Sequence, residues 1–159
     1  MISKYKKSDT SKILYIINDA SLKYKGIIPN DCWHEPYMSE QELIDEFNDG
    51  VCVYGYHQNN KLIGVIGVQE VKNVVLIRHA YTLTSYQNKG AGSALLEYLL
   101  KKNRYSRLLV GTWKSATWAI QFYEKSGFVM QKRKQTVELL KRYWEVSLKQ
   151  IENSVVLEK

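Results

Sequence analysis

The stretch Gln87-Asn88-Lys89-Gly90-Ala91-Gly92-Ser93-Ala94-Leu95-Leu96 lies between two segments of different periodicity. The run before it, 74–83, is typical of a β-strand, whereas the leucines within and after it recur at helical spacing. Two glycines therefore fall where a strand gives way to a helix. The first N–H groups of a helix have no partner inside it, and glycine lets an anion approach them because it carries no Cβ. The stretch therefore predicts an anion-binding site, with phosphate as the first candidate ligand.

Length and charge limit the classes of protein to which the chain can belong. Its 159 residues suit one domain, 1–159, and 45% hydrophobic with 25% charged residues indicates a globular chain. The formal net charge of +7 favours a polyanionic partner or serves solubility alone. The densest basic cluster, Lys132-Arg133-Lys134, is too short for a nucleic-acid-binding arm, so nucleic acid is not expected as a partner.

Cysteine usage and the N-terminus indicate the compartment. Cys32 and Cys52 form neither a disulfide framework nor a metal-binding motif, so we expect no metal and two buried thiols in a reducing compartment. The first residues lead into no apolar signal segment, and no run approaches the roughly 20 apolar residues that span a bilayer. We therefore expect a cytoplasmic protein without a membrane partner.

Before the glycines, the pattern changes from helical to alternating. Residues 2–6 predict a short strand, and a helix with an apolar stripe follows. An irregular, aromatic-rich loop occupies 24–38, and Ser39 with Glu42 is the capping box of a second helix. Period-two segments then predict a three-strand antiparallel meander over 51–84.

After the glycines, helices and strands alternate. A helix over about 89–103 leads into a strand at 107–112, which should lie parallel to the strand before the glycines because a helix joins them. Ser115 is the expected cap of the next helix, and Gly127 ends it. The remaining expected elements are a strand at 128–130, a helix at 136–144 and a strand at 154–157. This order predicts a mixed α/β sheet with a parallel junction in its middle, beside which ligands bind.

Two common phosphate-binding motifs fit the glycines poorly. A dinucleotide fold requires Gly-x-Gly-x-x-Gly, and Leu95 stands where its third glycine would be. A nucleoside triphosphate loop requires Gly-Lys-Ser/Thr after its second glycine, which this chain lacks. Another phosphate-bearing ligand must therefore be considered.

The pattern Gln87-x-x-Gly90-x-Gly92, which opens a helix after an antiparallel strand, resembles the acetyl-CoA motif of the GNAT N-acetyltransferase superfamily. The downstream stretch 119–128, AIQFYEKSGF, resembles that family's second motif. The resemblance covers a core of about 2–130, and 131–159 is a divergent C-terminal helix and strand. It implies an α/β fold with a mixed, mostly antiparallel central sheet, helices on both faces and a splayed parallel strand pair in the middle.

The resemblance implies that acetyl-CoA is the co-substrate. Its pyrophosphate would lie on the loop residues Gln87, Asn88, Lys89, Gly90, Ala91, Gly92 and Ser93, and its pantetheine arm would pair with backbone at about Leu83. The family often carries an asparagine three residues before the second motif, and Ala116 stands there instead. That contact is not carried over, so donor binding rests more heavily on the first motif.

The resemblance also suggests the groups that move protons. Tyr123 maps to a tyrosine that protonates the leaving thiolate, although it could simply pack its helix on the sheet. The family often has a carboxylate base on the strand 74–84, which here holds Arg78 and His79 instead. Strict alternation places His79 on the face of Ile77, opposite Arg78, where it would be a base or proton relay or a structural histidine.

In this superfamily the acceptor is recognised by the loop after the first helix and by the late strands. The candidate residues here are Trp33, His34, Glu35, Tyr37 and Trp113, with Glu35 as the group that would hold an ammonium ion. The alternative is that these aromatic side chains only pack the loop. We expect direct acetyl transfer from acetyl-CoA to a primary amine of a small molecule or a protein. The alternative function is a non-catalytic acyl-CoA-binding regulatory module, and exchange of the C-terminal strand would give a homodimer.

Overall fold

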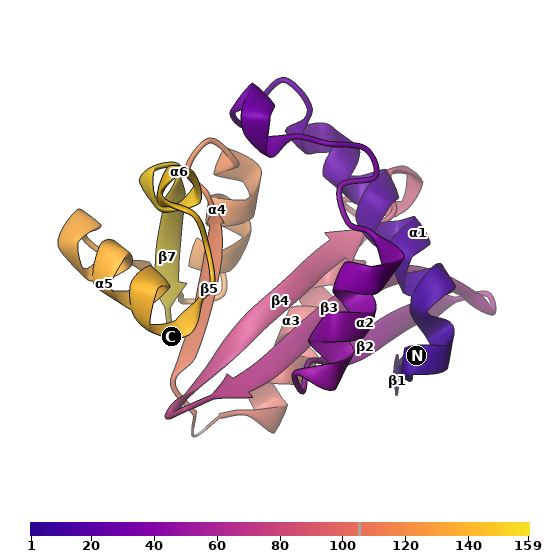
Figure 1. The fold of residues 1–159 in the computed structure, drawn as a ribbon. Coiled ribbons are helices and arrows are strands. Elements are labelled where there is room, and N and C mark those ends of the chain that lie inside the picture. Colours follow the sequence, from indigo (N-terminus) through magenta and orange to yellow (C-terminus); the bar gives the residue numbers. More distant parts are fainter. Residues whose placement is uncertain (105) are drawn as a thin grey trace.

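Seven strands form one sheet in the order β1-β2-β3-β4-β5-β7-β6 in the computed structural model, which describes residues 1–104 and 106–159 (Figure 1). The strands are β1 (Ile2–Lys4), β2 (Cys52–Gln58), β3 (Lys61–Val71), β4 (Val74–Thr82), β5 (Leu108–Trp113), β6 (Val129–Met130) and β7 (Ser154–Glu158). Within the described residues, β4 and β5 are the one parallel pair, and the other neighbours are antiparallel. This confirms the predicted α/β class with a mixed, mostly antiparallel sheet.

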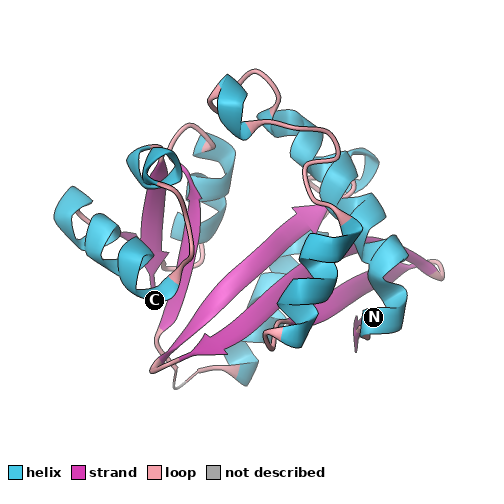
Figure 2. Cartoon of the chain, in the orientation of Figure 1, coloured by secondary structure: helices cyan, strands magenta, loops and turns pink. Residues whose placement is uncertain are grey.

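Helices cover both faces of the sheet, also as predicted (Figure 2). The helices are α1 (Thr10–Ser21), α2 (Glu40–Asn48), α3 (Ala91–Lys102), α4 (Thr117–Glu124), α5 (Arg133–Tyr143) and α6 (Leu148–Glu152). Against α3 and α4 the sheet buries a cluster that includes Ile77 and Leu96. Against α1 and α2 it buries a second cluster around Leu43. α5 and α6 pack on β5 and β7, where Leu109 and Leu140 are buried together.

Local sequence signals set several element ends. The capping box of α2 forms as predicted, because Ser39 N–H donates to the Glu42 carboxylate and Glu42 N–H donates to Ser39 Oγ, at 2.7 and 3.2 Å. Gly127 has φ +88° and ends α4 through the paired hydrogen bonds of a Schellman motif. The predicted cap at Ser115 is wrong, since Ala116 is the N-cap of α4 and makes no side-chain hydrogen bond.

The C-terminal part departs most from expectation. α5 begins three residues before the predicted helix, and β6 has two residues. α6 was not predicted, although Ser147 and Gln150 form its capping box, with bonds of 2.9 and 3.2 Å. β7 lies between β5 and β6 of its own chain, so the final strand completes the sheet within the molecule.

Solvent exposure corrects one further expectation. Cys32 and Cys52 are free thiols, as predicted, but each is partly exposed, so the expected burial of both is wrong. Of the helices in residues 1–104 and 106–159, none is both long enough and apolar enough to cross a membrane.

A β-bulge interrupts β4 at His79. Tyr81 pairs with Val65 and Arg78 pairs with Gly67, so two residues of β4 oppose a single residue of β3. His79 has φ +49°, which reverses the direction of its side chain relative to a regular strand. The predicted alternation is therefore wrong: His79 leaves the face of Ile77 and joins Arg78 on the side of α2.

The bulge lies where β4 and β5 separate. The two strands are paired at Val75–Leu108, Leu76–Leu109 and Ile77–Val110. Beyond these pairs β4 continues to Thr82 beside β3 and β5 continues to Trp113 beside β7, and the described residues show no further pairing between β4 and β5. Figure 1 shows the carboxyl-terminal halves of the two strands diverging. This confirms the splayed parallel pair in the middle of the sheet.

Candidate active site

The glycine stretch forms a loop of exposed amides at the start of α3. Gly90 is the N-cap of that helix with φ +91°, and Asn88 two residues earlier has φ +61°. When residues with positive φ alternate with residues with negative φ, successive N–H groups can point to the same side of the chain. In the described part of the chain, the N–H groups from Asn88 to Ser93 have no protein acceptor. Together with the positive end of the α3 dipole, these amides are suited to an anion.

A cavity of about 250 Å³ lies beside this loop. It extends from the glycine stretch across the end of β4 to α4. Of the predicted donor-binding residues, those that line it are Gln87, Asn88, Gly90, Ala91, Gly92 and Ser93. From the other elements its walls include Lys23, Ala80, Thr82, Trp118, Phe122 and Tyr123. We call this space the donor cavity.

Two predicted donor residues lie outside its lining. Lys89 donates from Nζ to the Ser85 carbonyl at 3.1 Å, and its ammonium lies 5.3 Å from the ring centre of Tyr86. Leu83 is buried, and its N–H donates to the Ile63 carbonyl at 2.9 Å. The Leu83 amide is therefore already bonded within the sheet and is not free to pair with the pantetheine arm.

Tyr123 is brought to the donor cavity by α4. The residue is 5% exposed and packs edge-on against Phe122, with ring centres 5.1 Å apart. Burial raises the pKa of its hydroxyl well above the usual value, and nearby Tyr24 raises it further. The hydroxyl is therefore protonated at neutral pH and can act as a hydrogen-bond donor.

A second cavity, of about 330 Å³, lies on the side of α2. The polar groups in its wall are Cys32, His34, Tyr37, Glu42, Glu46, Arg78, His79, Tyr81 and Gln150. Trp113 of β5 and Trp144, which follows α5, add flat apolar surface. A smaller cavity of about 180 Å³ also borders Tyr37, Trp113 and Trp144. We call the 330 Å³ space the acceptor cavity.

Tyr81 lines both the donor cavity and the acceptor cavity. It stands just after the bulge, at the point where β4 and β5 have separated. The two cavities therefore approach one another through the gap in the sheet.

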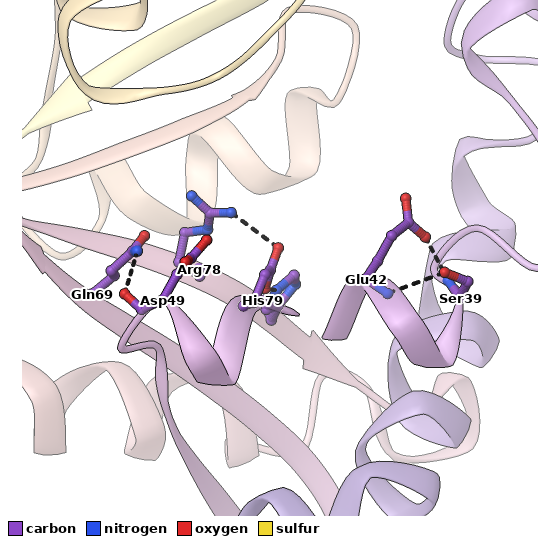
Figure 3. Close-up of polar contacts among 7 residues, drawn as sticks. Ser39, Glu42, Asp49, Gln69, Arg78 and His79 are labelled. Carbon is purple, nitrogen blue, oxygen red and sulfur yellow. Dashed lines mark hydrogen bonds and ion pairs between the residues drawn. The ribbon is translucent and has the colours of Figure 1, made fainter. Parts of the chain in front are cut away.

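His79 and Arg78 both contact Glu46 of α2. Figure 3 shows Arg78 and His79, with a dashed line from the Arg78 guanidinium that marks its hydrogen bond. Arg78 donates from a terminal guanidinium nitrogen to Glu46 Oε1 at 3.0 Å, and His79 Nε2 bonds to Oε2. Burial alone would raise the pKa of Glu46, but the hydrogen bonds and charges of His79 and Arg78 outweigh it, and the pKa lies below its usual range. The carboxylate is therefore ionised at neutral pH.

The predicted acceptor residues separate into two groups. Tyr37 and Trp113 line the acceptor cavity and are joined by a hydrogen bond of 3.0 Å from the indole N–H to the hydroxyl. Trp33 stacks on Tyr37, with ring centres 5.6 Å apart, and is not itself part of the cavity wall. Glu35 is exposed, pairs with Lys25 at 3.0 Å and is not part of the cavity wall.

Sequence reasoning missed the acids that do face the acceptor cavity. Glu42 and Glu46 are four residues apart on α2 and share one side of that helix. The family pattern places the catalytic base on the strand 74–84, and it gives no indication of a carboxylate on a helix. The i, i+4 spacing of the two acids was the available signal. Trp144 and Gln150 were missed because the course of the chain after α5 was not predicted.

Comparison with known proteins identifies relatives of this arrangement. A family profile described as the acetyltransferase (GNAT) domain matches residues 18–141. A comparison with curated proteins gives no significant match.

Solved structures give the same result at the level of the fold. The chain is similar to the PaiA N-acetyltransferase of Thermoplasma acidophilum in complex with coenzyme A, with TM-score 0.71 and 20% identity over 100% of this chain and 98% of that one. A GNAT-family acetyltransferase of Staphylococcus aureus Mu50 has TM-score 0.73 and 18% identity over 100% and 97%. The ribosomal-protein-S18-alanine N-acetyltransferase of Escherichia coli has TM-score 0.69 and 19% identity over 99% and 91%.

Proposed function

The chain belongs to the GNAT family of acetyltransferases, and on that basis we propose that it transfers the acetyl group of acetyl-CoA directly to a primary amine. The observation that carries the proposal is Tyr81, which borders the donor and the acceptor cavity at the gap between β4 and β5. A thioester and an amine that enter from the two sides can come into contact there. Direct transfer then needs no covalent intermediate on the protein.

The glycine loop is the proposed site of the donor's pyrophosphate. Its unpaired amides from Asn88 to Ser93 supply hydrogen bonds, and Lys23 in the cavity wall adds positive charge. The pantetheine arm would lie along the open side of β4. Because Leu83 donates toward β3, strand alternation directs the N–H groups of Ala80 and Thr82 toward the side that β5 has left. These amides are the proposed donors to the arm and to the thioester oxygen.

The chemistry requires one proton acceptor and one donor. His79 in the acceptor cavity takes a proton from the amine as the nitrogen–carbon bond forms and the carbon–sulfur bond breaks. Tyr123 in the donor cavity donates a hydrogen bond to the leaving sulfur. A thiol has a pKa near 8.5, well below that of this buried phenol, so stabilising the thiolate suffices and complete proton transfer is not required.

The acceptor is proposed to be a small amine or a protein amino group. A thiol-release screen with acetyl-CoA as donor tests this across polyamines, amino acids, aminoglycosides and peptides. At least one class should yield free thiol together with an acetylated amine. Acetyl-CoA binding without thiol release from any amine would contradict the proposal and favour the non-catalytic acyl-CoA-binding module.

A further inference from the structure

The bulge in β4 places two basic side chains around one acid. Arg78 and His79 are consecutive, so in a regular strand they would point to opposite faces of the sheet. With His79 at φ +49°, both reach Glu46 of α2. The side chains of His79, Glu46 and Arg78 are 13, 19 and 23% exposed, so the group is largely shielded from water.

The backbone conformation of His79 is unfavourable by itself. A left-handed residue other than glycine is strained because Cβ crowds the following carbonyl. Histidine is among the residues other than glycine that adopt it more often, and here its side chain also contacts Glu46 and Tyr81. A regular strand would turn the imidazole toward the apolar cluster around Ile77, where it would have no acid partner. The polar contact that stabilises the observed direction is the hydrogen bond to Glu46.

We propose that Glu46 is the positioning residue for the reaction on the acceptor side. Its carboxylate accepts the Nε2–H of His79, fixes the imidazole as the Nε2–H tautomer and leaves Nδ1 to receive the proton of the amine. This inference rests on the proposed function, since it assigns how the proposed base is held. It adds a catalytic support from α2, an element outside the two motifs that identify the family.

Charge around the imidazole supports this direction of the hydrogen bond. Arg78 already donates to Glu46, and an ionised carboxylate is an acceptor only, so His79 is the donor of the remaining bond. The other titratable groups in the cavity wall are Glu42 from α2, Tyr81 from β4, and Cys32, His34 and Tyr37 from the loop before α2. β5 contributes Gly111 and Trp113, and α6 contributes Gln150, none of which is charged. In the described chain, no protein group is bonded to His79 Nδ1.

The first test uses the unmodified protein and needs no substrate. Heteronuclear NMR of the histidine side chains reports the tautomer of neutral His79, with His79→Asn used to assign its signals. Asparagine tolerates φ +49°, so this variant should fold. We expect Nε2 to carry the proton and Nδ1 to be bare. A neutral His79 protonated at Nδ1 would overturn the proposal.

The second test is kinetic and uses Glu46→Gln, with Asp45→Asn as the matched control. Asp45 is on the same helix, exposed and bonded to Gln41 at 2.8 Å. Glu46→Gln should lower kcat/KM for the amine about 10- to 100-fold and leave acetyl-CoA affinity unchanged. Asp45→Asn should change neither quantity.

A double-mutant cycle separates positioning from folding. If Glu46 acts through His79, then Glu46→Gln should cause no further loss of kcat in the His79→Asn background. If the two losses multiply instead, Glu46 has a merely structural role. If wild-type protein acetylates no amine, the proposed function fails, but the tautomer measurement still decides how Glu46 holds His79.

Discussion

The ring of Tyr81 stacks on the imidazole of His79, with ring centres 6.3 Å apart and planes inclined by 25°. The two residues flank Ala80 at the bulge, and both lie on the α2 side of β4. Tyr81 also reaches the donor cavity, which His79 does not. Burial raises the pKa of the Tyr81 hydroxyl far above its usual value, so this ring carries no charge between the two cavities. The stack therefore places a neutral aromatic wall beside the proposed base.

Gly90→Asp should abolish acetyl-CoA binding. The new carboxylate would stand at the N-terminus of α3, against the pyrophosphate that its amides are proposed to hold. Acetyl-CoA affinity measured by calorimetry should fall at least tenfold, which corresponds to about 1.4 kcal/mol. Retained affinity would show that the anion site lies elsewhere.

Gly50→Asp is the matched control for that experiment. Gly50 has φ +92°, and a Cβ there would meet no atom within 4 Å, as is also true of Gly90 at φ +91°. Both substitutions therefore impose the same backbone strain without a clash. A loss of binding in Gly90→Asp alone, with both variants folded, would isolate the effect on the ligand.

Tyr123→Phe should slow turnover while acetyl-CoA still binds. The substitution removes the hydroxyl that is proposed to stabilise the leaving sulfur and keeps the ring packed on the sheet. Loss of one positioned hydrogen-bond donor to a developing charge costs on the order of 100-fold in kcat. Tyr54→Phe is the control, because Tyr54 is 5% exposed in the same cluster and is not part of the donor cavity wall. Equal activity of the two variants would exclude Tyr123 from the chemistry.

Features of the fold that depend on short-range signals were predictable. The strand-to-helix junction at Gly90 follows from a residue that adopts positive φ next to a helical leucine pattern. The end of α4 at Gly127 and the start of α2 at Ser39 have the same local origin. The two motif stretches, 87–96 and 119–128, accordingly supply half of the residues that line the donor cavity.

The acceptor side was not predictable in the same way. The bulge at His79 depends on how β4 aligns with β3. The alternation of apolar and polar residues in the sequence does not show where one extra residue enters a strand. Glu46 becomes a partner of His79 only once α2 has packed on the sheet. Glu35 was predicted to hold the acceptor's ammonium group because it is an acid within the aromatic loop. In the structure it is exposed and forms an ion pair with Lys25. Side chains that meet across elements require the tertiary structure.

Stability should depend on pH through Glu46. Its pKa is lowered in the folded state, so its contribution is complete above the unfolded value of about 4.3 and is lost as the pH falls through the folded pKa. Compared with Glu46→Gln, wild-type protein should be more stable by about 2 kcal/mol at pH 5.5, and the difference should shrink toward pH 3. Urea unfolding at several pH values measures this. A difference that does not vary with pH would contradict it.

Trp144→Ala should weaken binding of the acceptor and leave that of the donor unchanged. The Trp144 ring packs against Gly111 of β5, where an added Cβ would lie 3.5 Å from it. It lines the acceptor cavity and the neighbouring cavity of about 180 Å³. Removing this flat wall should raise KM for the amine about tenfold. Leu148→Ala on α6 is the control, since Leu148 is 71% exposed. If Trp113→Ala raised KM and Trp144→Ala did not, the segment between α5 and α6 would have no part in acceptor recognition.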